Sequence, residues 1–394
     1  MTIALFVTLI LLLVPDFYIS FTFLRHAPVV WRVLVFLPTV VGLLSMLVMF
    51  YKGFSSLFGT IFLAVLLCVA LPKMTLMAFS LIAKLLGHWS PAAATVTNTV
   101  GFVAAFVVSL MALYAILFGW KQLETKHVDL YFDNLPAAYD GYRIAHLSDL
   151  HVGTYGQKTA FVEKVVAQVN AEHPDLIVFT GDLVNIEPEE ILPFRTVLSR
   201  LSAPDGVISV LGNHDYCLYG DPNRWLNPRE AGLEVAEIEE SMGWKVLLNE
   251  SFVLDRAGER LAIVGVENTG KPPFPKIGDL KAAVSGITDY DTVKCDDEIF
   301  AVLLSHDPSQ WRMEVLPQTH IPQTHIPLML SGHTHAAQFK LFGWSPASWM
   351  YKEWGGAYQS GNQQLYISEG LGGTLQFRFG SRPQVVILTL HSEQ

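Results

Sequence analysis

Long apolar stretches dominate the first third of the chain, and they restrict its possible folds more than any other feature. An α-helix needs about 20 apolar residues to cross a bilayer. Four stretches reach about that length, near Ile3–Leu24, Val29–Tyr51, Phe54–Leu71 and Ala94–Trp120. The sequence therefore predicts a transmembrane helical region over residues 1–120, with about four spans.

A weaker stretch at Thr75–Trp89 contains Lys84 and His88. It could form an interfacial helix, a re-entrant segment or the continuation of a long third helix, and we favour the interfacial helix. Asp16 interrupts the first span. A carboxylate there needs a cationic partner such as Arg32 or Lys84, unless it lies near a helix end.

Charged residues are distributed unevenly along the chain. After residue 130 the sequence contains 33 Asp and Glu against 19 Lys and Arg, a net charge of −14. Such an acidic region repels polyanions, so we expect no nucleic-acid binding and favour small or lipid-linked phosphates as ligands. Cys68, Cys217 and Cys295 are too few and too widely spaced to predict a disulfide framework or a Cys-rich zinc site.

The pattern changes after Trp120. Residues 121–142 are typical of a short linker followed by a first strand, and residues 143–394 of an α/β domain. Its short β-branched runs predict strands at Arg143–Leu147, Leu176–Thr180, Val207–Leu211, Ile299–Leu304 and Leu328–Leu330. Amphipathic patterns predict helices at Thr159–Val169 and Glu234–Met242.

Five short polar motifs follow apolar strands in this domain. Each motif alone occurs by chance, and its simplest interpretation is a turn carboxylate or a surface histidine. Together they supply four carboxylates, one amide and five histidines, ligands that suit Mn, Fe or Zn better than Ca. Loops at the carboxyl ends of parallel strands meet in one crevice, so we expect the motifs to converge. They are Asp149-Leu150-His151, Gly181-Asp182, Gly212-Asn213-His214-Asp215, Ser305-His306-Asp307 and Gly332-His333-Thr334-His335.

Two further histidines lie in a tandem repeat of Gln-Thr-His-Ile-Pro over residues 318–327. We interpret His320 and His325 as parts of a lengthened loop rather than as ligands, because loops tolerate insertions. His146, three residues before Asp149, is more typical of a core or supporting histidine than of a ligand.

The order of the five motifs resembles that of the calcineurin-like metallophosphoesterases, from about Arg143 to Leu390. Leu135-Pro136, Asp140–Ile144 and Ile367–Gly372 also resemble the membrane-associated bacterial branch of that family. The resemblance implies a four-layer αββα sandwich and two divalent metal ions, which could be Mn, Fe or Zn. Every metal-binding position of the family pattern is filled, and the tandem repeat is the visible departure.

Carried over by position, the resemblance assigns two sets of metal ligands. The first comprises Asp149, His151, Asp182 and His335, and the second Asp182, Asn213, His306 and His333. Asp182 would bridge the two ions, which together would acidify a shared water and bind phosphoryl oxygens. The expected reaction is hydrolysis of a phosphoester or pyrophosphate bond by a metal-bridging hydroxide.

The resemblance also implies a catalytic histidine that is not a ligand. His214 would stabilise the phosphoryl group or protonate the leaving oxygen, with Asp215 as its orienting partner. The alternative is that His214 only caps its turn.

Seven aromatic residues lie between Phe339 and Tyr358, directly after the last motif. They could pack as the core of a hairpin, or they could form an acyl-chain groove or contact lipid headgroups. The sequence does not favour either reading.

These observations predict a membrane-anchored phosphohydrolase with an amphiphilic or lipid-linked substrate, as the UDP-2,3-diacylglucosamine hydrolases of the family illustrate. A soluble phosphodiester or a phosphoprotein is an alternative substrate. A membrane sensor or scaffold that only binds is an alternative function. A transporter fits less well, because few charges lie within the spans.

We expect a multi-pass protein of a bacterial inner membrane, in contact with membrane lipids. Lys and Arg near the span ends, three on one side against four on the other, do not decide its orientation. No Lys or Arg precedes the first span, which argues against a cleavable signal peptide. Outside the cytoplasm, Cys217 would be an unpaired thiol near a metal centre in an oxidising space, only three residues from His214. We therefore predict a cytoplasmic catalytic domain.

Overall fold

The computed structural model describes residues 2–53, 55–221, 224, 227–287, 299–317 and 326–393. The chain forms two compact units. One comprises Met1–Gly119 with Leu375–Phe379, and the other comprises Trp120–Thr374 with Gly380–Gln394. Cys295, His320 and His325 lie outside the described residues.

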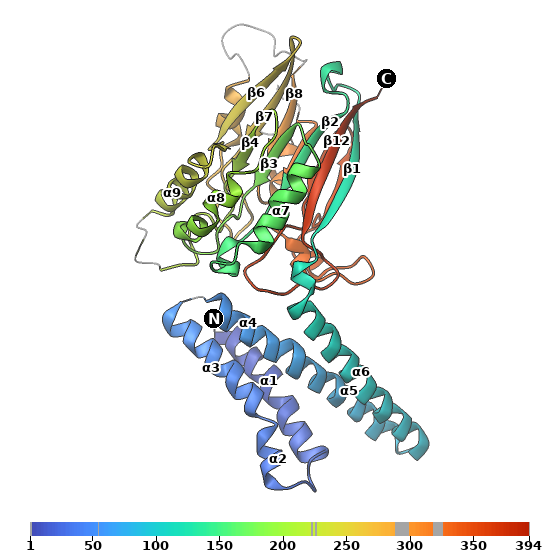
Figure 1. Ribbon diagram of the computed structural model, residues 1–394. Coiled ribbons are helices and arrows are strands. Elements are labelled where there is room, and N and C mark those ends of the chain that lie inside the picture. The colour runs from blue at the N-terminus through green and yellow to red at the C-terminus, as the bar shows by residue number, and fades with distance from the viewer. Residues whose placement is uncertain are drawn as a thin grey trace. The chain divides into compact units, whose positions relative to one another are not determined.

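The first unit is helical (Figure 1). Its apolar side chains are exposed on all sides, as on Phe6, Val103 and Phe106, which is typical of helices that face lipid. Its helices are α1 Thr2–Thr22, α2 Val29–Leu34, α3 Leu37–Lys52, α4 Ser56–Val65, α5 Leu71–Leu86 and α6 Pro91–Leu117, with a π-helical turn η1 at Leu66–Ala70.

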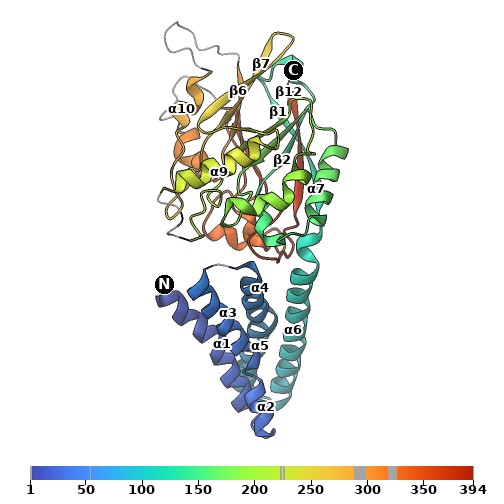
Figure 2. The same ribbon diagram turned by 60° about the vertical axis from the view of Figure 1, so that its left-hand side comes forward.

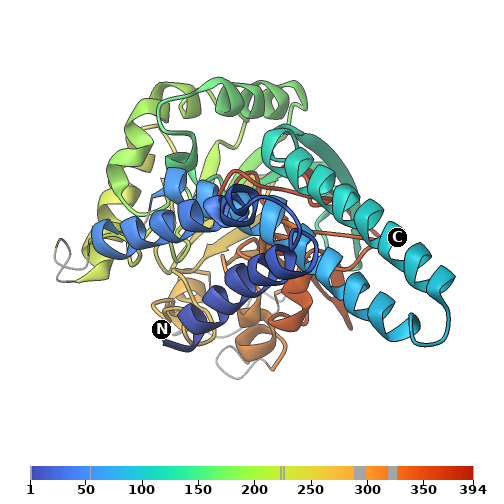
Figure 3. The ribbon, with the colours of Figure 1, turned by 90° about the horizontal axis from the view of Figure 1, so that it is seen from below.

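Three helices in the described part of the chain are long and apolar enough to cross a membrane. They are Val29–Tyr51, Ser56–Leu86 and Pro91–Lys121, and Phe6–Thr22 is a shorter apolar helix. Neighbouring helices α5 and α6 lie side by side (Figures 2 and 3). Gly101 makes this close approach possible, since a Cβ there would lie 2.5 Å from Cβ of Phe79.

The favoured prediction of an interfacial helix at Thr75–Trp89 is wrong. Residues 56–86 form one continuous helix, which corresponds to the alternative of a long third helix. The π-helical turn η1 joins α4 to α5 and precedes Pro72, which lacks the N–H that a regular helix would use. The charge of Lys84 favoured an interface, but its Nζ lies 4.7 Å from the centre of the Tyr18 ring within the bundle.

The partners suggested for Asp16, Arg32 and Lys84, are also wrong. Its carboxylate accepts a hydrogen bond from Lys73 at 2.5 Å.

The second unit contains two six-stranded sheets. The strands of the first sheet, in order, are β1 Glu124–Phe132, β12 Gln384–Ser392, β2 Tyr142–Leu147, β3 Leu176–Thr180, β4 Val207–Val210 and β5 Lys245–Val246. Those of the second are β10 Gly356–Ser360, β11 Gln363–Ile367, β9 Leu328–Ser331, β8 Phe300–Leu304, β7 Glu259–Gly265 and β6 Glu250–Arg256. Residues 121–142, expected as a linker and first strand, contain β1, which forms an edge of the first sheet.

The sheets pack face to face, and helices cover their outer faces. Ile144 and Leu176 point into the core between the sheets, whereas Ala145 and Ile177 point to the helical side. Strands buried on both faces explain the continuous apolar runs in the sequence. The fold is therefore the four-layer αββα sandwich that the resemblance implies, which is confirmed. The outer layers are α7 Ala160–Ala171, α8 Arg195–Leu198 and α9 Pro228–Glu240 on the first sheet, and α10 Leu280–Ser285 with the π-helical turn η6 Trp311–Val315 on the second.

Strand direction places the polar motifs. Strands β2, β3 and β4 run parallel in the first sheet, and β8 and β9 run parallel in the second. Each of the five motifs directly follows the carboxyl end of one of these strands. The five motif loops can therefore meet at one end of the sandwich.

Candidate metal centre

The structure brings all seven predicted metal ligands together at that end. The donor atoms of the six Asp and His residues among them form two groups, and the atoms of each group lie within 4.8 Å of one another. The first contains Asp149, His151, Asp182 and His335, and the second contains Asp182, His306 and His333. Asp182 belongs to both groups, as a bridging ligand must.

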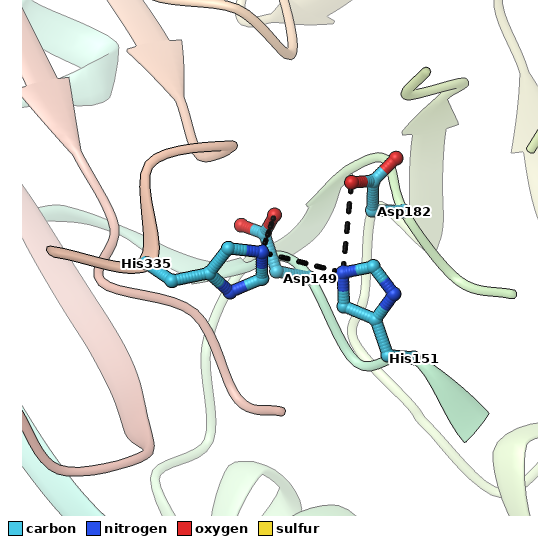
Figure 4. Close-up of side chains that lie close together, drawn as sticks. All are labelled: Asp149, His151, Asp182 and His335. Atoms are coloured by element: carbon cyan, nitrogen blue, oxygen red, sulfur yellow. Dashed lines mark hydrogen bonds and ion pairs between the residues drawn. The ribbon is translucent and has the colours of Figure 1, made fainter. Parts of the chain in front are cut away.

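In the first group, imidazole nitrogens and carboxylate oxygens face one another (Figure 4). Nε2 of His335 lies 3.4 Å from Oδ1 of Asp149 and 3.3 Å from Nε2 of His151. Nε2 of His151 lies 3.6 Å from Oδ2 of Asp182. These separations are wide enough for a cation to contact several of the donors at once.

The second group is built around His306. Its Nε2 lies 3.1 Å from Oδ2 of Asp182, 3.2 Å from Oδ1 of Asn213 and 3.1 Å from Nδ1 of His333. Asn213 therefore lies where its predicted role as a ligand requires.

Contacts behind the imidazoles decide which nitrogens can donate lone pairs. Nδ1 of His306 lies 2.7 Å from the carbonyl oxygen of Thr180, so Nδ1 carries the proton. Nδ1 of His151 is likewise 3.1 Å from Oδ1 of Asn185. In the neutral form of either ring, which metal binding requires, Nε2 then presents a lone pair to the carboxylates. Converging lone pairs and carboxylates fit a divalent cation.

The pKa shifts of the cluster also favour a site for bound cations. Burial raises the pKa of Asp149 to about 7. Burial opposes protonation of His306, but the carboxylates of Asp182 and Asp149 raise its pKa to about 10. Protons would thus be drawn into the cluster to balance buried negative charge, a task that bound cations perform in a metal centre.

Five of the seven predicted ligands have backbone conformations that are uncommon for residues with a side chain. Their φ angles are 55° for Asp149, 50° for His151, 58° for Asp182, 72° for His333 and 48° for His335. Such conformations cost of order 1–3 kcal/mol each and persist where the surrounding structure enforces them, often at functional sites.

Neighbouring glycines leave room for the ligands. A Cβ at Gly332 would lie 2.3 Å from Oδ2 of Asp149, and one at Gly212 would lie 2.3 Å from Oδ1 of Asp182. Both contacts are far shorter than atoms tolerate. The Gly-His and Gly-Asn motifs therefore need glycine for close packing against a carboxylate.

Asp215 differs from its expected role as the partner of His214. Its carboxylate accepts hydrogen bonds of 2.8–3.1 Å from backbone N–H groups of the motif loops after β3 and β4. The carboxylate thus ties these two loops together. The donors are Asp182, Leu183, Val184 and Gly212.

The orienting contact to His214 that the sequence suggested for Asp215 comes instead from Asn185. Nδ1 of His214 donates to the carbonyl oxygen of Asn185 at 2.7 Å, and the backbone N–H of His214 donates to Oδ1 of Asp182 at 2.8 Å. The first bond leaves Nε2 of His214 available to a substrate. The ring lies 4.7 Å from that of His151, beside the first group of ligands.

Three further side chains contact the ligand groups in ways that the sequence did not predict. The hydroxyl of Tyr351 lies 2.6 Å from Nε2 of His333, and Oδ2 of Asp307 lies 3.6 Å from the same atom. The Asn213 side chain donates to the hydroxyl of Tyr219 at 3.0 Å. Asp307 has a sequence signal, because it belongs to the Ser305-His306-Asp307 motif, and Tyr351 lies in the aromatic segment after the last motif, whereas Tyr219 has no such signal.

His146 lies in the core, as its sequence context suggested. It is fully buried, and its Nε2 lies 2.9 Å from the hydroxyl of Thr180. Burial lowers its pKa to about 3, so the ring is neutral.

A pocket of about 430 Å³ opens over the ligand groups. Its polar lining includes Asp182, Asn213, His214, His333 and His335. Its apolar lining includes Phe274, Pro346, Ala347, Trp349 and Met350. The pocket therefore joins a site for a phosphoryl group to a surface that favours an apolar group.

Comparison with known proteins agrees with this geometry. Residues 142–337 match the family described as calcineurin-like phosphoesterase. The chain is 29% identical to the metallophosphoesterase YkuE of Bacillus subtilis, over 68% of this chain and 86% of YkuE. A transmembrane protein with a metallophosphoesterase domain from Danio rerio is 26% identical, over 73% of this chain and 62% of its own length.

The UDP-2,3-diacylglucosamine pyrophosphatase LpxG of Chlamydia trachomatis is also similar. It is 26% identical to this chain, over 65% of this chain and 86% of LpxG.

Proposed function

We propose that this chain, a membrane-associated metal-dependent phosphoesterase that belongs to the calcineurin-like phosphoesterase family, cleaves a phosphoester or pyrophosphate bond of a lipid-linked substrate. The observation that carries the proposal is the convergence of the predicted ligands into two groups that share Asp182. Two groups with one common carboxylate are the arrangement that a pair of neighbouring cations requires.

Asp149, His151, Asp182 and His335 would hold one divalent ion in this proposal, and Asp182, Asn213, His306 and His333 the other. The mixture of imidazole, carboxylate and amide donors suits Mn, Fe or Zn. When bound, two such ions acidify a shared water and withdraw charge from phosphoryl oxygens.

The chain itself would orient the substrate and move a proton. His214 lines the pocket, and its Nδ1 is engaged by the carbonyl oxygen of Asn185, so that Nε2 would serve the substrate. From there the imidazole can donate a hydrogen bond to a phosphoryl oxygen or protonate the leaving oxygen. The carboxylate of Asp215 would hold the loops that carry Asp182 and His214 in register.

Three observations support a lipid-linked substrate. The chain contains helices long and apolar enough to cross a membrane, a similar protein is named as a pyrophosphatase of a diacylated sugar nucleotide, and several apolar residues line the pocket. The acidic charge of the second unit disfavours polyanionic substrates. We place the protein in a bacterial inner membrane with its catalytic domain in the cytoplasm.

A substrate panel tests this proposal. The purified full chain, supplied with Mn²⁺, Fe²⁺ or Zn²⁺, is assayed on a lipid-linked pyrophosphate, its deacylated counterpart, a soluble diester and a soluble monoester. We expect the highest kcat/KM for the lipid-linked compound. Preference for the soluble monoester would contradict a lipid-linked substrate, and binding without turnover of any compound would favour a sensor.

A further inference from the structure

The segment after the last motif exposes large apolar side chains. Phe342 is 98% exposed, Trp349 79% and Met350 66%. The ring of Trp344 packs edge-on against Trp349 at 5.3 Å. These residues are therefore not the core of a hairpin, and an exposed apolar cluster of this kind indicates a binding surface.

Part of this cluster lines the pocket of the metal centre. Trp349 and Met350 lie there with Phe274, Pro346 and Ala347, and we call these five residues the apolar wall. Phe342 and Trp344 do not line the pocket. The wall and the ligand groups thus share one cavity, whereas the remaining exposed aromatics lie outside it.

Residues that flank the apolar wall in sequence contact the metal centre and the loop that carries its ligands. Tyr351 follows Met350 directly, and its hydroxyl contacts Nε2 of His333 at 2.6 Å. On the other side, the hydroxyl of Ser345 donates to the carbonyl oxygen of Ala336 at 2.6 Å and accepts from the N–H of Ala347 at 3.1 Å. The backbone of residues 346–350, which carries every wall residue except Phe274, is therefore held at both ends, beside the loop that carries His333 and His335.

We propose that the apolar wall binds the acyl chain of the substrate while the phosphoryl group lies at the ligand groups. This inference rests on the proposed function and assigns the residues that would select a lipid. A single amphiphilic molecule could contact both, because the apolar wall and the polar residues of the ligand groups line one pocket. A bilayer surface would instead engage Phe342, the most exposed aromatic of the segment, which lies outside the pocket.

Binding of alkyl phosphates tests the wall without requiring turnover. The full chain is placed in nanodiscs with Mn²⁺, and its affinities for methyl phosphate and decyl phosphate are measured by calorimetry. We expect decyl phosphate to bind at least about tenfold more tightly, because two buried methylene groups contribute that much.

Two variants on the same segment localise the effect. Trp349→Ala should reduce the preference for decyl phosphate about tenfold and leave the affinity for methyl phosphate unchanged, which also reports an intact fold. Phe342→Ala is the matched control, and it should leave both affinities unchanged. Partition of decyl phosphate into the nanodisc lipid is the same for every variant and cancels in the comparison.

Two results would overturn the inference. Equal affinity of the unaltered protein for the two phosphates would exclude a tail site. Equal losses in Trp349→Ala and Phe342→Ala would assign the exposed aromatics to the bilayer surface instead. A failure of the proposed function looks different, since it would appear in the substrate panel as a preference for the soluble monoester or as binding without turnover, and it would leave the chain-length preference in binding intact.

Discussion

At the scale of single residues, His214 is the side chain whose proposed role is most open to a direct test. Its Nδ1 is held by the carbonyl oxygen of Asn185, and its ring lies beside the ligand groups. We predict that His214→Ala keeps its metal and loses about 10²–10⁴-fold in kcat, the usual contribution of a general acid or base. Metal analysis and steady-state kinetics on the same preparation check this, and loss of metal would mean that His214 is a ligand.

Tyr351 acts through His333 in this account. The hydroxyl 2.6 Å from Nε2 of His333 orients the ring, so that Nδ1 faces His306. We expect Tyr351→Phe to raise the Mn²⁺ concentration needed for half-maximal activity about 10–100-fold, the usual effect of losing such a supporting contact. Tyr131→Phe, at an exposed tyrosine on edge strand β1, is the control. An unchanged Mn²⁺ dependence in Tyr351→Phe would contradict the positioning role.

At the scale of elements, strands were easier to predict from sequence than the contacts of loops. Apolar runs predicted β2, β3, β4, β8 and β9, and the rule that loops meet at the carboxyl ends of parallel strands predicted the convergence of the motifs. The partner of His214 was not predictable, because Asn185 reaches it through a backbone carbonyl that every residue possesses. Proximity in sequence suggested Asp215, whose carboxylate instead serves backbone N–H groups.

Among the helices, the pair of Asp16 and Lys73 links α1 to α5. Lys73 donates to the Asp16 carboxylate and, at 2.7 Å, to the carbonyl oxygen of Val35. Removing one partner leaves a buried charge, which costs about 3–5 kcal/mol. We therefore predict that Lys73→Met lowers the thermal stability of the helical unit in detergent, and that Asp16→Leu combined with Lys73→Leu restores most of it.

The control for that pair is Lys84→Met. Lys84 contacts only the face of the Tyr18 ring in the interactions described for it, so its loss should change the melting temperature little. If Lys73→Met and Lys84→Met are equally stable, the Asp16–Lys73 pair does not hold the helices together. The sequence alone did not identify Lys73, because the pairing depends on the continuous helix through η1.

At the scale of the whole molecule, composition predicted the division into an apolar helical part and an α/β part. The α/β class and the layer order followed from apolar runs and from the family resemblance, and both are confirmed. The apolar wall was not predictable. Whether Trp349 packs in a core or lines a pocket depends on tertiary contacts that aromatic composition does not encode.

Orientation in the membrane is a further prediction at this scale. Cys217 is buried, and burial raises the pKa of its thiol, so the native cysteine is a poor reporter. Gln157→Cys places a thiol on the exposed surface of the α/β unit. We expect an impermeant thiol reagent to label it only after cell lysis, as a cytoplasmic domain requires. Ready labelling in intact cells would reverse the predicted orientation.

The most direct test of the account is the metal content and hydrolytic activity of Asp182→Asn, because Asp182 alone belongs to both ligand groups. Asp133→Asn, at an exposed carboxylate on the same unit, is the matched control. We predict that Asp182→Asn binds less metal and loses hydrolysis, whereas Asp133→Asn keeps both. Full metal content with unaltered turnover in Asp182→Asn would contradict a two-metal centre bridged by this residue.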